Sequence, residues 1–160
     1  MKIPPHHDSA CWGCGDNPNG IRLPQPTLEG AESYDAVLRF DERHQGGPGV
    51  AHGGLVSAAL DEACGLLATW HRFPSVTARL DVRYRRPVPI NVELRVRSRV
   101  ASQRGRTTTI HGELVDGHDQ LLAEAHGAFL HVPLEHFLQT PEGRTAGAAW
   151  RERLGRGSRG

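Results

Sequence analysis

A glycine-lined segment, residues 46–54 (GGPGVAHGG), comes directly before an apolar stretch that carries the acid Asp61. The pattern predicts a loop that opens a helix, whose first backbone amides are unpaired and lie at the positive end of the helix dipole. Such amides favour a carbonyl oxygen or an anion. Gly54 and Asp61 are seven residues apart, so they share one helical stripe at a separation of about 10 Å. A polarising amide and a carboxylate placed in this way could flank a reacting acyl group.

The length and composition of the chain suit one domain with a hydrophobic core. It has 160 residues, 38% of them hydrophobic, and a formal net charge of +1, which gives no indication of a nucleic-acid partner. No apolar run approaches the roughly 18 residues needed to cross a bilayer. The N-terminus also lacks the charged-then-apolar plan of a signal peptide. We therefore expect a cytoplasmic protein with neither a nucleic-acid nor a membrane partner.

Residues 1–30 are expected to form an N-terminal loop that carries the pair Cys11 and Cys14. A tetrahedral zinc site needs four ligands, and no second C-x-x-C supplies the other two. His6 and His7 could complete the set, but their spacing matches no familiar zinc module. A redox pair is expected at a strand-to-helix turn, whereas the sequence after Cys14 continues as a loop. A structural or pocket-lining loop is the favoured interpretation, with metal binding and redox chemistry as alternatives, so no metal site is assigned.

Hydrophobic periodicity predicts one long helix and five strands. The helix runs from residue 52 or 53 to about 70, and one of its faces has almost only small residues, so a sheet or second backbone must come close. The expected strands are 34–40, 77–84, 92–101, 107–115 and 121–132. Short turns join the last four strands, which predicts an antiparallel meander wrapped around the helix. Residues 139–160 lose periodicity and are expected to be a disordered tail.

Several motifs of the central region match a known family. They are Pro48-Gly-Val-Ala-His-Gly-Gly54, Asp61 nine residues after His52, Thr77 ten residues before Pro87, the strand end Tyr84–Val88, and Arg104-Gly-Arg106. On these motifs the chain resembles, over about residues 30–132, the hotdog-fold acyl-CoA thioesterases, most closely their phenylacetyl-type, PaaI-like branch. The resemblance implies an α+β hotdog domain over residues 31–138, with an antiparallel sheet wrapped around one long central helix. It also implies a site between two subunits, and hence a homodimer or a homotetramer.

The resemblance assigns a role to each matching residue. Asp61 would be the catalytic carboxylate, either a general base on water or a nucleophile on the thioester. The backbone amide of Gly53 or Gly54 would be the oxyanion donor, a contribution on the order of 3 kcal/mol in the transition state. His52 would shape the loop and hold the thioester. Thr77 would position the attacking water or the carboxylate.

Each assignment also has a plainer structural alternative. Asp61 could pair across a subunit interface without doing chemistry, and His52 could only cap the helix. Thr77 is β-branched and suits a strand without any functional reason. Glu62 is the second choice for the acid, because it points about 100° away from its neighbour around the helix.

The chain departs from the family pattern in the loop before the helix. Many relatives have an amide side chain six residues before the histidine that corresponds to His52, where it contacts the thioester. This chain has Gly46 at that position. Gln45, one residue earlier, could take the role after a small shift of the loop.

Arginines at strand ends and turns are candidates for binding the phosphates of coenzyme A, since a guanidinium offers a planar fork of donors. They are Arg85, Arg86, Arg104 and Arg106. The alternative is that these are solvated charges that protect the edge of a sheet.

The function favoured by the resemblance is hydrolysis of an acyl-CoA thioester to a free acid and coenzyme A. No separate cofactor is expected, because coenzyme A is part of the substrate. Two alternatives remain open: a non-catalytic acyl-CoA binding module, and an enoyl or hydroxyacyl thioester hydratase or dehydratase that uses His52 with Asp61. The acyl group cannot be deduced from the residues alone.

Overall fold

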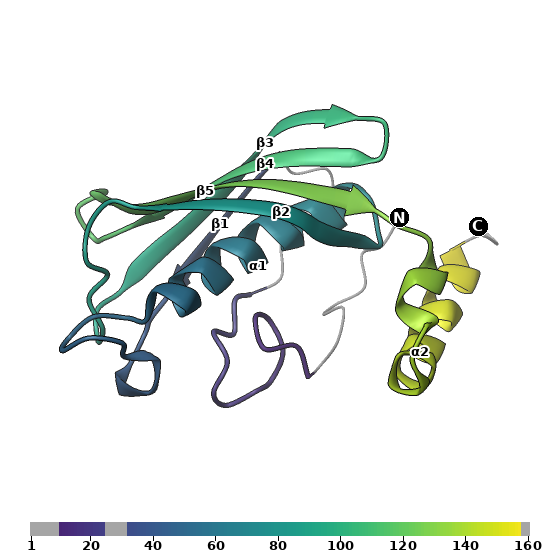
Figure 1. The fold of residues 1–160 in the computed structure, drawn as a ribbon, viewed down its shortest axis with the longest axis horizontal. Coiled ribbons are helices and arrows are strands. Elements are labelled where there is room, and N and C mark those ends of the chain that lie inside the picture. Colours follow the sequence, from purple (N-terminus) through teal and green to yellow (C-terminus); the bar gives the residue numbers. More distant parts are fainter. Residues whose placement is uncertain (1–9, 25–31, 158–160) are drawn as a thin grey trace.

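One antiparallel sheet covers one side of a long helix, as expected from the periodicity (Figure 1). The computed structural model describes residues 10–24 and 32–157. Its strands follow the spatial order β1-β3-β4-β5-β2, which confirms the predicted α+β arrangement. The elements are β1 (Ser33–Leu38), α1 (Gly53–His71), β2 (Ser75–Tyr84), β3 (Leu94–Arg104), β4 (Thr107–Val115), β5 (Leu121–His131) and α2 (Pro141–Gly157), with short 3-10 helices at Glu42–His44 and Leu134–Leu138.

The three central strands form a meander, and the two strands at the edges come from earlier in the chain. Arg104 pairs with Thr107 across the turn between β3 and β4, where Gly105 adopts a φ of +58° that suits glycine. After α1 the chain returns as β2, which pairs with β5, and no strand among residues 10–24 and 32–157 pairs with its other edge. That edge strand is ten residues long.

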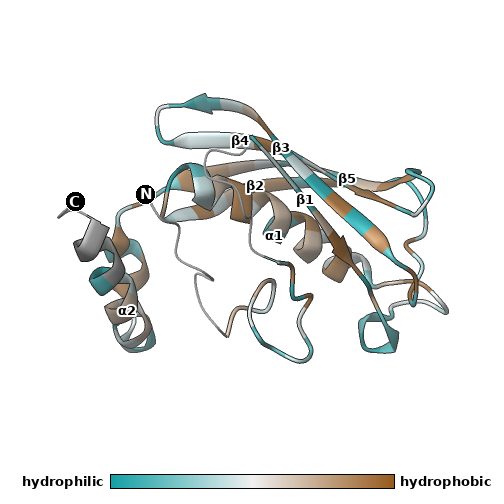
Figure 2. Cartoon of the chain, turned by 180° about the vertical axis from the view of Figure 1, so that it is seen from behind, coloured by the Kyte–Doolittle hydropathy of each residue, from teal (hydrophilic) through white to brown (hydrophobic). Residues whose placement is uncertain are grey.

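Helix α1 begins and ends with local hydrogen bonds that satisfy its terminal groups. At the start, His52 is the N-cap, and its Nδ1 accepts from the Gly54 amide at 3.0 Å. At the end, the amide of Arg72 donates to the Ala68 carbonyl at 3.0 Å. Hydrophobic residues predominate along α1, whereas hydrophobic and hydrophilic residues alternate along the strands (Figure 2). No helix in the described part of the chain is long and apolar enough to cross a membrane.

The backbone of α1 lies within hydrogen-bonding distance of the sheet. The buried Ser98 hydroxyl on β3 donates to the Ala63 carbonyl at 2.8 Å. A Cβ added to Gly112 on β4 would lie only 2.8 Å from Cys64 Sγ, so the strand carries no side chain there. The close approach predicted from the small residues of the helix is therefore found at Ala63 and Cys64. Its consequence is that Asp61, on the same helix, is held close to β2.

The C-terminal segment differs from the sequence prediction. Residues 139–160 were expected to be a disordered tail, whereas Pro141–Gly157 form the helix α2. The helix start carries a usable signal: Thr140 Oγ1 accepts from the Gly143 amide at 3.0 Å, and proline is favoured in the first turn. Trp150 then anchors α2 by ring contacts to Phe73 and Phe137, with centroids 4.9 and 5.1 Å apart. These contacts join residues far apart in the chain, so local periodicity does not reveal them.

The packing of Gly112 against Cys64 gives a test of the sheet-to-helix contact. We expect Gly112→Ala to lower the free energy of unfolding by about 1–3 kcal/mol, because the added methyl overpacks the core. Removing the sulfur with Cys64→Ala should recover part of that loss in the double variant. Chemical denaturation of the two single variants and the double variant measures the coupling.

The control for this experiment is Gly117→Ala, in a turn where an added Cβ meets no atom within 4 Å. Its effect should stay below about 0.5 kcal/mol. If Gly112→Ala lowered the free energy of unfolding equally in wild type and in the Cys64→Ala variant, the proposed contact would be contradicted.

Candidate active site

The Asp61 carboxylate is held by a hydroxyl from the neighbouring strand. Thr77 Oγ1 on β2 donates to Asp61 Oδ1 at 2.9 Å. Burial raises the pKa of Asp61 above the usual aspartate range, while the hydrogen bond from Thr77 acts in the opposite direction. The carboxylate is therefore oriented and partly desolvated, as a general base or nucleophile requires.

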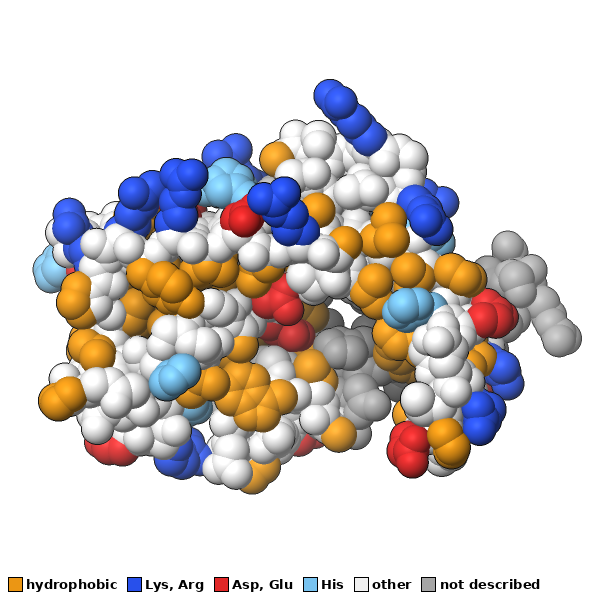
Figure 3. All heavy atoms as spheres, viewed as in Figure 1, with side chains coloured by type: hydrophobic (Ala, Val, Ile, Leu, Met, Phe, Trp, Pro, Cys, Tyr) orange, Lys and Arg blue, Asp and Glu red, His pale blue; other side chains and the backbone are white. Residues whose placement is uncertain are grey.

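Asp61 faces a cavity of about 230 Å³ between α1, β2 and the C-terminal helices. Figure 3 shows acidic side chains beside the hollow that separates the sheet and α1 from α2. Thr77 and Gly65 lie on the cavity wall near the acid. Its aromatic wall consists of Phe73, Phe129, Phe137 and Trp150. Trp150 comes from residues 139–160, which were expected to be disordered, and Phe137 lies at the end of the predicted domain, so the sequence prediction placed neither residue here.

The start of α1 supplies one free amide rather than two. His52 accepts the Gly54 amide through Nδ1, so that amide is occupied and the neutral imidazole carries its proton on Nε2. The Gly53 amide has no acceptor among the described residues. Of the two predicted oxyanion donors, the geometry therefore favours the Gly53 amide. His52 caps the helix, which was the structural alternative to its predicted role.

Tyr84 fixes the start of the helix, a role that sequence spacing did not indicate. Its hydroxyl donates to the Gly53 carbonyl at 2.8 Å and also contacts the Ser57 hydroxyl. Tyr84 ends β2, thirty-one residues from Gly53 in the chain, so only the fold brings them together. Gly53, Tyr84, Arg85 and Arg86 line a second cavity of about 330 Å³.

The carboxylate and the free amide of one chain are too far apart to act on one carbonyl group. Gly53 and Asp61 are separated by eight residues of α1, or about 12 Å along its axis. A carbonyl oxygen held by an amide and a water held by a carboxylate together span only roughly 8 Å. This corrects the expectation that an amide and the carboxylate of one helix flank a reacting acyl group: the two groups line separate cavities.

Gln45 closes the glycine loop with its side chain. Its Oε1 accepts from the Gly49 amide at 3.0 Å. Gly46 packs so closely that an added Cβ would lie 2.9 Å from the His52 Cα. A side-chain amide at position 46 would therefore displace the helix cap.

The four predicted phosphate-binding arginines fall into two separate pairs. Arg85 and Arg86 line the cavity at the start of α1, and Arg85 Nε donates to Glu124 at 2.9 Å. Arg104 and Arg106 flank Gly105, whose carbonyl accepts from Arg72 at the other end of α1. The 19 residues of α1 separate the two pairs by about 28 Å.

Two histidines without a predicted role meet on the sheet. His111 and His126 lie opposite each other on β4 and β5, with ring centroids 4.6 Å apart. Together with Glu124 they bring potential metal-ligating atoms within 4.8 Å of one another. Spacing along the strands did not reveal this group, since the cross-strand register creates it.

The central region of the chain matches a known protein family. The thioesterase superfamily model matches residues 48–123. No curated protein shows significant similarity to the chain. Among solved structures, protein RHA08564, a thioesterase superfamily protein, is 27% identical with a TM-score of 0.62 over 70% of this chain. The match covers 54% of RHA08564, so this chain corresponds to about half of that protein.

Two further structures share the fold at lower identity. PaaI from the phenylacetic acid degradation operon of E. coli is 16% identical, with a TM-score of 0.62 over 72% of this chain and 81% of its own. The protein smu.793 of Streptococcus mutans, solved with acetyl CoA, is 17% identical, with a TM-score of 0.63 over 69% of this chain and 88% of its own. The chain is therefore similar to the thioesterase superfamily over residues 48–123, and its sheet order with one long central helix is that of the hotdog fold.

Proposed function

We propose that the protein hydrolyses acyl-CoA thioesters at a site formed by two copies of the chain. The observation that carries this proposal is the half-buried Asp61 carboxylate, held by Thr77 in the lining of a cavity that has an aromatic wall. As general base, Asp61 takes a proton from water, which attacks the thioester carbonyl carbon and displaces the coenzyme A thiolate. As nucleophile, it would instead form an anhydride that water then opens.

The oxyanion donor is the Gly53 amide of the second chain. Within one chain this amide lies about 12 Å from Asp61, so a second copy has to supply it. The long exposed edge of β2 offers a surface for that copy, because an unpaired edge strand can accept another strand. The proposed functional unit is a homodimer, and two dimers could assemble further into a tetramer.

Coenzyme A is recognised at the start of α1. Arg86 lines the cavity beside Gly53 and is the first candidate for a phosphate contact, since Arg85 is engaged by Glu124. That smu.793 was solved with acetyl CoA supports coenzyme A thioesters as the ligand class. The aromatic wall of the Asp61 cavity favours a compact aryl or short acyl group over a long chain.

Two other functions have weaker support. A hydratase or dehydratase that uses His52 with Asp61 is disfavoured, because His52 caps the helix and Asp61 bonds Thr77. A non-catalytic acyl-CoA binding module is favoured by one observation, the lack of space for an amide side chain at Gly46. Thiol release from acyl-CoA separates the enzyme from the binding module.

Replacing the carboxylate gives the direct test of hydrolysis. We expect wild type to release thiol from phenylacetyl-CoA, benzoyl-CoA or hexanoyl-CoA faster than from palmitoyl-CoA. Asp61→Asn should lower kcat about 100-fold or more, because the base is lost while the shape is retained. Asp35→Asn, which removes an exposed carboxylate paired with Arg95 at the opposite edge of the sheet, should leave the rate unchanged. Binding of coenzyme A without any thiol release would support the binding module instead.

Gly53→Pro removes the backbone N–H of Gly53, which is the proposed oxyanion donor. Proline is tolerated at the first position of a helix, and His52, with φ −62° and ψ 131°, already has the extended conformation required before proline. Gly53→Pro should lower kcat about 100- to 1000-fold with folding intact. The matched control is Gly53→Ala, which keeps the amide and places its Cβ 3.6 Å from the Tyr84 ring. Equal activities of the two variants would exclude this amide as the donor.

The hydrogen bond from Thr77 should set the acid limit of activity. Because this bond lowers the pKa of Asp61, Thr77→Val should raise that pKa and move the acid limb of the kcat/KM profile to higher pH. Thr77→Ser keeps the hydroxyl and should retain the wild-type profile. Coincident acid limbs for the valine variant and wild type would show that Asp61 is not the titrating base.

A further inference from the structure

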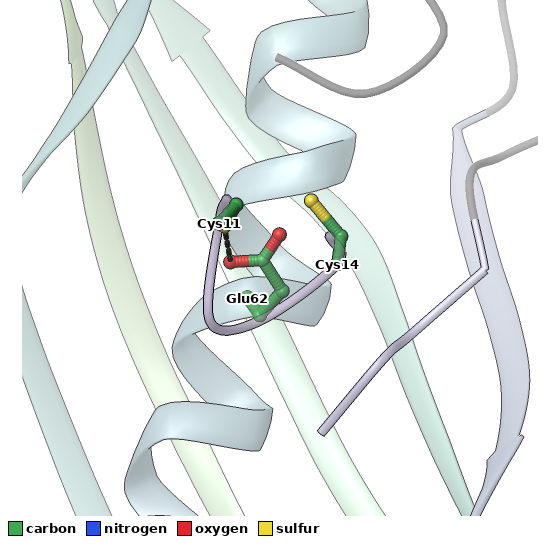
Figure 4. Close-up of side chains that lie close together, drawn as sticks. All are labelled: Cys11, Cys14 and Glu62. Carbon is green, nitrogen blue, oxygen red and sulfur yellow. Dashed lines mark hydrogen bonds between the residues drawn. The ribbon is translucent and has the colours of Figure 1, made fainter. Parts of the chain in front are cut away.

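The N-terminal loop and helix α1 bring three metal-ligating side chains to one point. Cys11 and Cys14 come from the loop and Glu62 from α1, and their ligand atoms all lie within 4.8 Å of one another. Figure 4 shows the two cysteines on either side of the Glu62 carboxylate, with Cys11 Sγ 3.9 Å from Glu62 Oε2. Cys14 is only 2% exposed, so part of the cluster lies in the core.

The loop is built around this carboxylate. The Gly15 amide donates to the Cys11 carbonyl at 2.8 Å and closes the turn between the cysteines. Leu23, 1% exposed, ties the loop down through its amide, which donates to the Gly13 carbonyl at 2.8 Å. A Cβ on Gly13 would lie 2.2 Å from Glu62 Oε2, so the loop backbone passes directly over the carboxylate and a side chain there would displace it.

We propose that Cys11, Cys14 and Glu62 bind a divalent transition metal ion, with zinc as the best fit. Thiolates favour soft and borderline metals, and the added carboxylate oxygen selects zinc over monovalent copper. In a tetrahedral site with Zn–S bonds of about 2.3 Å, neighbouring sulfurs lie roughly 3.8 Å apart. The ligand atoms lie within 4.8 Å of one another, so each pair would have to approach by about 1 Å or less to bind the ion. Each thiol transfers its proton to solvent as its metal–sulfur bond forms.

The bound ion joins the N-terminal loop to the helix turn that carries the catalytic acid. Glu62 follows Asp61 directly, and both line the same cavity. The described residues supply three ligands of a tetrahedral ion, which has four positions. Spacing alone could not reveal the site, because Glu62 lies 51 residues from Cys11 in the chain.

The cluster on the sheet is a weaker metal candidate. Its carboxylate, Glu124, already forms an ion pair with Arg85, and its member His126 is exposed. A cation there would have to displace the guanidinium. The cysteine cluster offers softer ligands and greater burial.

Metal titration of the reduced full-length protein tests the proposal. We expect one zinc per chain by elemental analysis after dialysis, and a thiolate-to-cobalt absorption band when Co²⁺ is added alone. Glu62→Gln, which keeps the side-chain shape, should weaken Co²⁺ binding about 100-fold or more, at least as much as loss of an outer-shell partner. Cys11→Ser and Cys14→Ser should each reduce the charge-transfer band. The matched control is Cys64→Ala, which removes a buried thiol elsewhere on α1 and should bind Co²⁺ as wild type does.

Three outcomes would overturn the metal site. The first is no bound zinc and no cobalt band from fully reduced wild type. The second is a Cys11–Cys14 disulfide in the protein as purified, identified by mass, that yields no Co²⁺ binding after reduction. The third is unchanged Co²⁺ affinity in Glu62→Gln. The glutamine variant keeps the test valid if the serine variants do not fold. Thiol release from acyl-CoA is not part of the readout, so failure here is independent of the proposed hydrolysis.

Discussion

The structure depends on how closely α1 packs against the sheet. A hydrogen bond from a strand hydroxyl to the helix backbone, Ser98 to Ala63, is possible only because the residues between the two layers are small. The pairing of Gly112 with Cys64 is the tightest point of that contact. Close packing leaves the helix little freedom to move. It therefore holds Asp61 beside the Thr77 hydroxyl on β2 and places Glu62, the next residue, beside Cys11 of the N-terminal loop.

The same helix explains why the proposed site needs two chains. Its first amide is aimed at one cavity and its acid at another, two turns further along. A helix cannot bend enough to bring these groups onto one carbonyl, since its rise is fixed at about 1.5 Å per residue. Pairing of two antiparallel copies would place the amide of each against the acid of the other. In the proposed site, helix α1 therefore links catalysis to the association of two chains.

Local patterns in the sequence were sufficient for the central fold. Alternation located the strands, and the glycine loop with its small-residue helix predicted α1, because these signals repeat along the chain. A threonine cap marks the start of α2 locally, but the contact between Phe73 and Trp150 that anchors the helix joins residues far apart in the chain. The same holds for the roles of Tyr84 and Glu62, which arise only from contacts between distant segments. The helix cap also distinguishes the two candidate oxyanion donors, because the Gly54 amide donates to the His52 side chain.

The most direct test of the two-chain site is to mix two inactive variants, Gly53→Pro and Asp61→Asn. In a mixed dimer one site combines the altered residues of both chains, and the other combines Gly53 of one chain with Asp61 of its partner. Random exchange of equal amounts should restore about a quarter of the wild-type thiol release, because half of the dimers are mixed and each has one intact site of two. No recovery, with mixed dimers verified by mass, would contradict a site shared between chains.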